Sequence, residues 1–372
     1  MRAYPLALAF ALSPLPLAAQ IDTVDLTGQP VETVIPAEFA GGFFARIAGM
    51  VVDDRGIWVV DRGHLTVFGF GPGGNLTAQY GREGDGPGEF LFPSSLKVDS
   101  VLTVTDPRLG RTVRFSLDGE HLETTGQEGR PETPDGREVP FGNVASLPDG
   151  YLIGATVGYY AFGGSSDGSP FLGDPYSHIL LFHPDGLQAD TLASYHINAG
   201  RWDAPERLGG NIDPGLGASG TWTALGDSMA VLADGIAGTL TRVRIVDGRP
   251  VADTFDLGMR ARPVSDRDVA DIEARLRKEK PDLPRRLEFE MAEGWSVATA
   301  VFPGRDGEFW LRQAVEGEGQ EWVVVRPGLA RKWRIMLPER FRLSAIHGGY
   351  LYGVARDAFD VASVARIADP PR

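Results

Sequence analysis

The chain contains no cysteine among its 372 residues. This absence excludes disulfides, iron–sulfur clusters, zinc–thiolate sites, cysteine nucleophiles and bacterial lipoprotein anchors. Positive charge is also scarce, because 36 Lys and Arg stand against 50 Asp and Glu and leave a net charge of −14. Nucleic acid usually binds to a basic face, so this balance disfavours a nucleic-acid partner.

Long hydrophobic runs are missing beyond the N-terminus. Residues 1–20 place one arginine before an apolar run that ends in Ala18 and Ala19, which predicts a secretory signal peptide cleaved near residue 19. The run contains three prolines and is shorter than the ~20 residues of a membrane span, although an uncleaved anchor is the alternative. We therefore expect an exported protein, periplasmic or secreted, without a transmembrane segment.

Glycine and proline are abundant, with 48 and 27 residues, and 42% of the chain is hydrophobic. Such a chain can bury a large core, and its many turn residues favour an all-β fold over a helical one.

A repeat is visible in two consecutive segments. Gly56–Asp61 and Val101–Asp106 both alternate apolar residues and end in aspartate, and the two aspartates lie 45 residues apart. Each is followed by glycine after 13 and after 20 residues, at Gly74 and Gly81 and at Gly119 and Gly126. A repeat of about 40–50 residues with four short strands is typical of propeller blades.

The pattern that begins each repeat, a turn residue followed by alternating apolar residues, returns four more times. Six blades are therefore predicted, and a hidden seventh blade is the alternative. The further starts are at Asp149–Ile153, Gly226–Leu232, Asp306–Leu311 and Gly348–Tyr352. Two long intervals predict a loop insertion at about 160–176 and a helical insertion at about 260–290. The expected organisation is a signal peptide over residues 1–20 and one propeller domain over residues 21–372.

One helix is well marked. Ser265 and Asp268 form a short version of the capping box, and Val269, Ile272 and Leu276 form an apolar stripe. We expect an amphipathic insertion packed on the propeller, with a lid over the central channel as the alternative.

The last blade shows three strands, around residues 342–347, 350–355 and 361–367. Its sheet edge would be exposed, so we expect an N-terminal strand, Thr23–Leu26 or Glu32–Ile35, to close the ring.

Tyr80-Gly-Arg-Glu-Gly-Asp-Gly-Pro-Gly-Glu-Phe90 is the most characteristic stretch, and it lies between clear β segments. Together with Ile57–Asp61, Val67–Phe68, Gly73–Leu76 and Pro93 it resembles an NHL-type repeat. The resemblance is to exported bacterial six-bladed β-propeller proteins, and it implies an all-β, NHL-like six-bladed propeller. Related six-bladed families include binding modules, amidating lyases, strictosidine-synthase-like enzymes and calcium-dependent lactonases, so fold analogy does not choose an activity.

Motifs for catalysis are absent from the linear sequence. It contains no HExxH zinc motif, no Gly-x-Ser-x-Gly elbow, no phosphate-binding loop and no EF-hand loop. We therefore predict no metal site and no cofactor from the sequence. Calcium stays open as an alternative, because aspartates recur near blade starts, where they most often form Asx turns.

Charged residues in the loops carry the binding hypothesis. In a propeller, the crossovers between blades and the turns joining second and third strands open on one face. The residues expected there are Arg62, His64, Arg82, Glu83, Asp85, Asp106, Arg108 and Arg111. Arginines beside carboxylates can bind a carboxylate or peptide by bidentate contacts, although pairing among themselves is the alternative.

We therefore favour a non-catalytic exported binding or scaffold protein, expected to be a monomer, that recognises a protein, peptide or small ligand on its loop face. The alternative is a metal-dependent hydrolase or lyase with its site in the central channel, which would need several Asp, Glu, Asn or His side chains to converge there.

Overall fold

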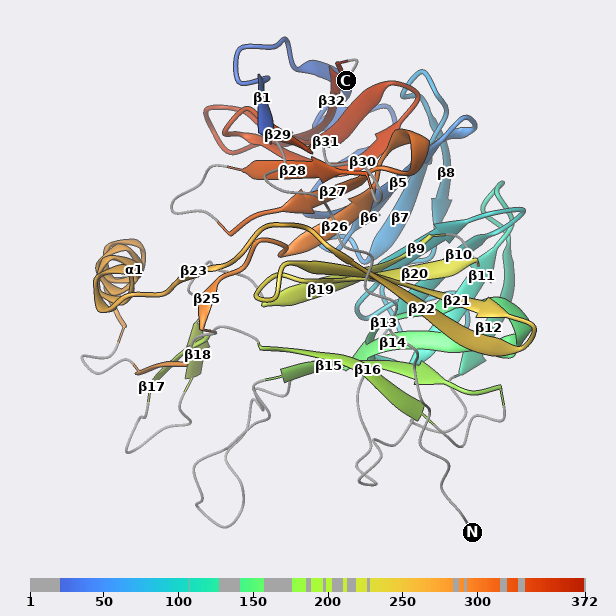
Figure 1. Ribbon diagram of the computed structural model, residues 1–372. Helices are drawn as coiled ribbons and strands as arrows, with labels where there is room; N and C mark the ends of the chain where they lie inside the picture. Colours follow the sequence, from blue (N-terminus) through green and yellow to red (C-terminus); the bar gives the residue numbers. More distant parts are fainter. Residues whose placement is uncertain are drawn as a thin grey trace. The chain divides into compact units, whose positions relative to one another are not determined.

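The protein is described by a computed structural model whose regular secondary structure consists almost entirely of strands (Figure 1). It describes residues 21–106, 108–126, 141–156, 176–184, 189–196, 199–202, 210–212, 219–225, 228–283, 288–290, 293–314, 320–326 and 332–370. The predicted signal peptide and most of the predicted loop insertion at 160–176 lie outside these residues. The chain divides into two compact units.

One unit consists of residues 25–144, 302–306 and 336–372 and contains three four-stranded antiparallel sheets. The first has the order β2-β32-β31-β30 and the others follow the chain as β5-β6-β7-β8 and β9-β10-β11-β12. Their bounds are β2 (Glu32–Ile35), β30 (Phe341–His347), β31 (Tyr350–Arg356), β32 (Ala362–Ala368), β5 (Ile47–Asp53), β6 (Gly56–Asp61), β7 (Thr66–Phe70), β8 (Leu76–Tyr80), β9 (Ser95–Val98), β10 (Leu102–Asp106), β11 (Arg111–Phe115) and β12 (His121–Gly126). The short hairpin β3 (Glu38–Phe39) and β4 (Gly42–Phe43) precedes β5.

The other unit contains the residues up to Val24 together with residues 145–301 and 307–335. Its large sheets have the orders β13-β14-β15-β16, β19-β20-β21-β22 and β1-β29-β28-β27-β26. Their bounds are β13 (Phe141–Ser146), β14 (Leu152–Thr156), β15 (Tyr176–Phe182), β16 (Ala189–His196), β19 (Gly220–Leu225), β20 (Met229–Asp234), β21 (Thr239–Val246), β22 (Arg249–Asp256), β1 (Ile21–Asp25), β26 (Ala300–Pro303), β27 (Phe309–Arg312), β28 (Glu321–Val325) and β29 (Lys332–Met336). Small sheets are formed by β17 (Ala199–Trp202), β18 (Gly210–Ile212) and β24 (Glu288–Glu290), and by β23 (Arg262–Pro263) and β25 (Gly294–Trp295).

The described residues thus form six sheets of four or five strands, as the six repeat starts predict. Each start leads into or coincides with the second strand of one sheet, namely β6, β10, β14, β20, β27 and β31. The predicted strands of the last blade are confirmed as β30, β31 and β32.

The core lies between neighbouring sheets. All six residues of β6 are buried, because each face of the strand packs on a different sheet. Ile57 and Val59 belong to a cluster with β31 and β32, and Trp58 and Val60 to a cluster with β10 and β11. This two-sided burial explains why the strand is continuously apolar and does not alternate with polar residues.

Two N-terminal strands complete sheets made from the end of the chain. β2 pairs with β32, and β1 lies beside β29 as the outermost strand of its sheet. Of the two segments predicted to pair with the last blade, Glu32–Ile35 does so, whereas Thr23–Leu26 overlaps β1, which lies in the sheet of β29. Closure of a ring by β2 stays a prediction. The pairing protects the outer edge of β32, which would otherwise expose its backbone groups.

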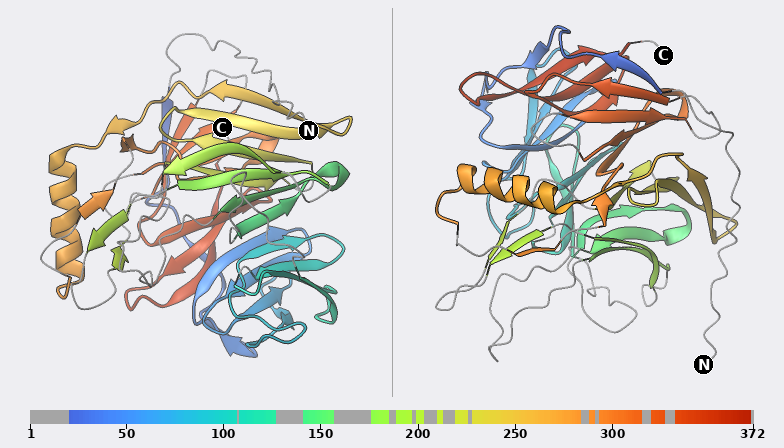
Figure 2. Two further views of the ribbon diagram at one scale, coloured as in Figure 1. Left: turned by 90° about the horizontal axis from the view of Figure 1, so that it is seen from below. Right: turned by 60° about the vertical axis from the view of Figure 1, so that its left-hand side comes forward.

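The predicted helix is α1 (Asp266–Glu279), and Ser265 and Asp268 form its capping box. Its buried residues Ile272 and Leu276 pack on Trp295 of β25, beside the small sheets (Figure 2). This matches an amphipathic insertion that packs on its own unit. No helix in the described part of the chain is both long and apolar enough to cross a membrane.

Candidate binding face

The topology of the three sheets in residues 25–144 and 336–370 places several loops together. Strands alternate in direction within each sheet, so the turn after the second strand and the crossover after the fourth strand leave at the same end. The turns β6–β7, β10–β11 and β31–β32 and the crossovers 36–46 and 81–94 therefore share one side, which we call the loop face. The inner strands β30, β5 and β9 lie side by side in this order.

Two buried aspartates at the ends of second strands organise the loop face. The carboxylate of Asp61 accepts backbone N–H bonds from Ala45 at 2.7 Å and Arg46 at 3.0 Å, and from Gly63 and His64 in its own turn. Asp61 therefore ties the β6–β7 turn to the crossover 36–46, which enters the same sheet.

Asp106 makes the same connection in the next sheet. It accepts from Leu91 at 2.7 Å and Phe92 at 2.8 Å in the crossover, and from Arg108 and Leu109 in the turn. Asp106 was predicted as a binding residue, but its side chain is fully buried and both oxygens are engaged by backbone amides. In this structure it holds the face together and has no free oxygen for a ligand.

Arg62 joins the two sheets across the loop face. Its Nε donates to the carbonyl oxygen of Pro93 at 3.1 Å, and its guanidinium lies 4.1 Å from the ring centre of Phe92. Burial lowers the pKa of Arg62, and the neighbouring charge of Arg46 adds to the effect. The charge of Arg46 disfavours a further cation here, so the pair formed by Arg46 and Arg62 is suited to an anion.

The side chains that these loops present on the loop face form what we call the arginine–phenylalanine patch. It consists of Phe43, Arg46, Arg62, His64, Phe92 and Arg108. Phe43 is 54% exposed and Phe92 is 41% exposed, and the ring of His64 lies edge-on to Phe43 at 4.7 Å. Among the described residues, the side chains of Arg46 and Arg108 have no hydrogen-bonding or ionic partner. The patch therefore combines exposed aromatic area with unneutralised positive charge.

The other predicted residues divide into framework and surface. Arg111 donates to the carbonyl oxygens of Asp85, Gly86 and Glu89 at 2.7–2.8 Å, so it clamps the crossover and is not free to bind. Arg82 is 80% exposed but is paired with Glu89 at 2.8 Å.

Glu83 and Asp85 are exposed on the same crossover. They leave negative charge beside the arginine–phenylalanine patch, so the loop face presents both signs of charge.

Three patch residues, Phe43, Arg46 and Phe92, are not among the predicted ones. A signal for the first two was present, because they directly precede the inner strand β5 and so occupy a crossover like 81–94. Their exposure could not be predicted, since it depends on how Asp61 folds the crossover back onto the β6–β7 turn.

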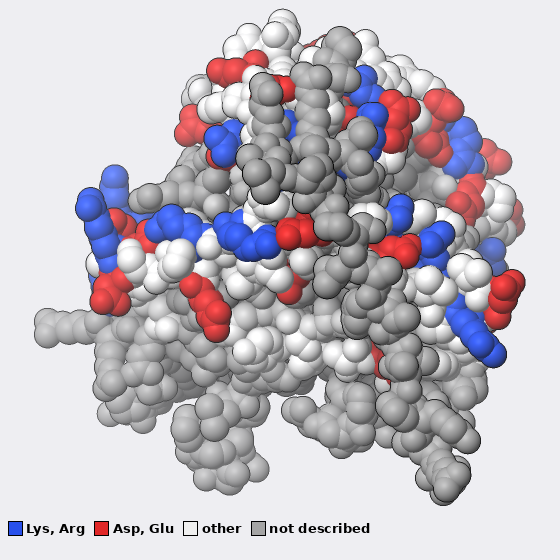
Figure 3. Space-filling model, viewed as in Figure 1, with Lys and Arg blue, Asp and Glu red and all other residues white. Residues whose placement is uncertain are grey.

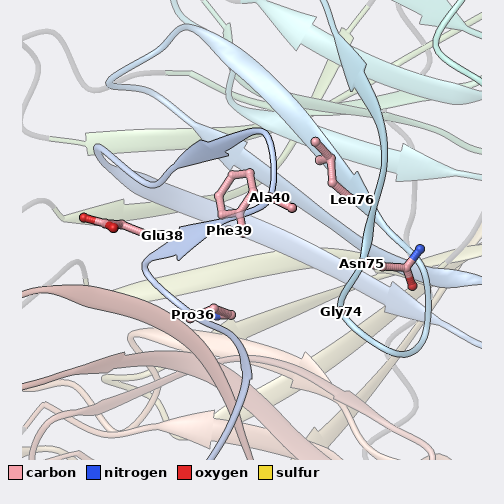
Figure 4. Close-up of a pocket in the computed structure, with 7 residues that line it drawn as sticks. All are labelled: Pro36, Glu38, Phe39, Ala40, Gly74, Asn75 and Leu76. Carbon is pink, nitrogen blue, oxygen red and sulfur yellow. The ribbon is translucent and has the colours of Figure 1, made fainter.

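A separate open hollow of about 550 Å³ lies between residues 36–40 and the β7–β8 turn (Figure 4). Glu38 and Asn75 are its polar lining residues, and Phe39 packs on Phe44, Phe68 and Phe70. One carboxylate and one amide do not make an acid–base pair or a metal site.

A metal centre is not assembled by the part of the chain that the structure describes, where no group of three His, Asp or Glu side chains could hold an ion. Two histidines in this part instead pair with single carboxylates, His347 with Asp54 at 2.9 Å and His183 with Asp190 at 2.8 Å.

Charges on the helix are largely neutralised locally. Figure 3 shows Lys and Arg side chains around α1 with Asp and Glu side chains close by. Several of these charges form i,i+4 ion pairs, including Arg277 with Glu273 at 2.6 Å and Arg275 with Glu279 at 3.3 Å. The helix therefore offers less free charge than the arginine–phenylalanine patch.

Comparison with known proteins supports the fold. Residues 44–128 match a family described as a 6-bladed beta-propeller. A Bacteroides fragilis protein described as exported has a similar structure, with 12% identity, a TM-score of 0.52 and coverage of 95% of this chain and 100% of that one.

A member of the DUF4221 family from Bacteroides vulgatus has 10% identity and a TM-score of 0.49 over 91% of this chain and 95% of that one. No curated protein matches the sequence significantly. Six repeated sheets, the family match and the Bacteroides fragilis structure together identify the chain as a six-bladed β-propeller protein.

Proposed function

We propose that this chain is an exported, non-catalytic binding protein whose partner docks on the loop face. The observation that carries the proposal is the arginine–phenylalanine patch. Aromatic and arginine side chains are enriched at protein interfaces, and a few of them commonly supply most of the binding energy.

Rigidity of the patch also supports a binding role. Asp61 and Asp106 hold the backbone of all its loops, so a partner would not have to order them. A preorganised surface loses less conformational entropy when it binds. Export is an expectation from residues 1–20, and it agrees with the description of the Bacteroides fragilis protein.

The test is capture of a partner from the exported protein fraction by immobilised mature protein. Phe43→Ser with Phe92→Ser should lose the captured protein, whereas Leu122→Ser should keep it. Leu122 is 50% exposed on β12, outside the patch, and is therefore a matched control. Equal capture by wild type and the double variant, with unchanged melting temperatures, would contradict the proposal.

The alternative, a metal-dependent hydrolase or lyase, is tested by a thermal-shift titration of metal-stripped protein with Ca²⁺, Zn²⁺, Mg²⁺ and Mn²⁺. An ion that binds the folded state alone adds about 2.7 kcal/mol of stability at a hundredfold excess over its Kd. A saturable shift with one ion would favour the metal-site alternative and call for an esterase, lactonase and lyase screen.

A further inference from the structure

A third exposed phenylalanine lies on the loop face. Phe359, in the β31–β32 turn, is 87% exposed. Its turn is firmly built, because Asp357 Oδ1 accepts from the backbone N–H groups of Phe359 at 2.8 Å and Val361 at 3.0 Å. A structured turn that presents a large apolar side chain to solvent is suited to anchor a partner.

Arginine side chains donate hydrogen bonds to backbone carbonyl oxygens of the β31–β32 turn, as Arg62 does in the arginine–phenylalanine patch. Arg340 donates to the carbonyl oxygen of Asp357, and Arg356 donates to that of Asp360 at 2.8 Å. The backbone N–H of Arg356 bonds to Arg340 O at 3.0 Å, just as that of Arg62 bonds to Arg46 O at 2.9 Å. The two arginine pairs therefore occupy equivalent places in neighbouring sheets.

This equivalence extends the binding surface over three sheets. Phe359 belongs to the sheet β30–β32, Phe43 and Arg46 precede the neighbouring inner strand β5, and Phe92 and Arg108 belong to the loops of the sheet β9–β12. Because β30, β5 and β9 are adjacent, the exposed groups follow one another across the loop face.

Positive charge along this surface is not fully compensated. Arg46, Arg108 and Arg342 of β30 have no side-chain partner among the described residues, and Arg62 contacts a carbonyl oxygen and an aromatic ring. A chain with net charge −14 nevertheless gathers these arginines at one end of three sheets. Carboxylates are the groups that arginine binds most favourably in bidentate geometry.

We propose that the partner supplies an extended acidic peptide segment that lies across these three sheets. Its carboxylates contact Arg46, Arg62 and Arg108, and an apolar side chain packs on Phe359. This inference rests on the proposed binding function and specifies its ligand. An extended chain covers at most ~3.3–3.6 Å per residue, so a segment of about twelve residues reaches several loops and one of about four residues does not.

The test uses full-length mature protein and three fluorescent peptides. The first has about twelve residues of glutamate, leucine and serine, the second replaces every glutamate with glutamine, and the third is a four-residue version of the first. We expect the long acidic peptide to bind at least tenfold more tightly than either of the others. Its affinity should fall as salt is raised, because exposed charges are screened.

Variants locate the contacts. Arg46→Gln with Arg108→Gln should weaken binding of the long acidic peptide about tenfold or more, and Phe359→Ser should weaken it without affecting the four-residue peptide. Arg114→Gln is the control, because Arg114 is an exposed arginine of β11 that pairs with Glu123 away from the loop face. Equal affinity for the glutamate and glutamine peptides, or no effect of Phe359→Ser, would overturn the inference.

Failure of this inference is distinguishable from failure of the proposed function. If the variant Phe43→Ser with Phe92→Ser no longer captures the partner but the protein shows no preference for acidic peptides, only the peptide inference is contradicted. Capture that does not depend on Phe43 and Phe92 would remove both.

Discussion

Buried aspartates are the residues on which the loops of this molecule depend. Asp61 and Asp106 each accept four backbone N–H bonds, and Asp234 accepts two in the β20–β21 turn. The prediction that aspartates near blade starts or strand ends form Asx turns is therefore confirmed for Asp61 and Asp106. A carboxylate is required because an N–H bond to a charged acceptor is stronger than one to a neutral group.

Replacing Asp61 with asparagine tests this role. Asn has one acceptor oxygen and no charge, so several buried N–H groups lose their partner, and we expect the free energy of unfolding to fall by about 1.5–3 kcal/mol. Urea unfolding of the full chain measures the change. Asp99→Asn is the control, since Asp99 is exposed and paired with Lys97, and equal midpoints for both variants would contradict the structural role.

Asp256 provides a pH-dependent prediction. The hydrogen bond from Arg260, with one from the backbone of Gly258, lowers the pKa of Asp256 from 3.8 to about 2. A lowered folded-state pKa contributes stability above pH 3.8 that is lost as the pH falls through about 2. Because both side chains are substantially exposed, the contribution is small.

The measurement is an NMR titration of the Asp256 carboxyl carbon. In Arg260→Gln the pKa should rise toward 3.8, and in Arg275→Gln, a control on α1, it should stay near about 2. An unchanged pKa in Arg260→Gln would show that the arginine is not its cause.

At the scale of elements, the crossover 81–94 depends on its glycines. Gly81 has φ +66°, and a Cβ atom there would lie 2.3 Å from the ring of buried Phe90. Gly84 has φ +147°, in a region that side chains rarely adopt. The glycine-rich motif is thus needed to turn the chain tightly between β8 and β9.

Gly81→Ala should lower the free energy of unfolding by about 1–3 kcal/mol, because it adds both backbone strain and a clash with Phe90. Thermal and urea unfolding measure the loss. Gly28→Ala is the matched control, since Gly28 has open space around it. Equal stability of the two variants would contradict the prediction, because it would show that the crossover accommodates a side chain at position 81.

The N-terminal strands make a second prediction at this scale. Deleting residues 21–36 removes β1 and β2, exposes the edges of β29 and β32 and removes the fully buried Ile35, so the whole protein should be destabilised. Ile35→Ala alone should cost about 2–5 kcal/mol, and Val31→Ala, at an exposed position, much less. A truncated protein with an unchanged melting temperature would refute the role of these strands.

For the whole molecule, the loop face makes the functional prediction. Arg82→Ala with Arg108→Ala removes two exposed positive charges, one paired with Glu89 and one without a side-chain partner in the described residues. We expect weaker partner capture with an unchanged melting temperature, because surface ion pairs contribute about 0–1 kcal/mol. Loss of stability would instead show that these arginines are structural.

The sequence alone was sufficient for the architecture. The repeat that ends in Asp61 and Asp106 predicted six blades, and the six sheets follow it. The capping box at Ser265 predicted α1, and the free edge of the last blade predicted pairing with Thr23–Leu26 or with Glu32–Ile35, of which the second pairs with it as β2. These features could be recognised because turn residues, apolar alternation and helix caps act over a few neighbouring residues.

Only the tertiary structure decided which charged residues can bind. Asp106 and Arg111 have the same residue types as a binding site would need, but long-range contacts make them part of the framework. Phe43, Arg46 and Phe92 are instead presented together because Asp61 and Asp106 fold distant loops onto one another. Local sequence does not carry this information, since exposure depends on contacts between residues that are far apart in the chain.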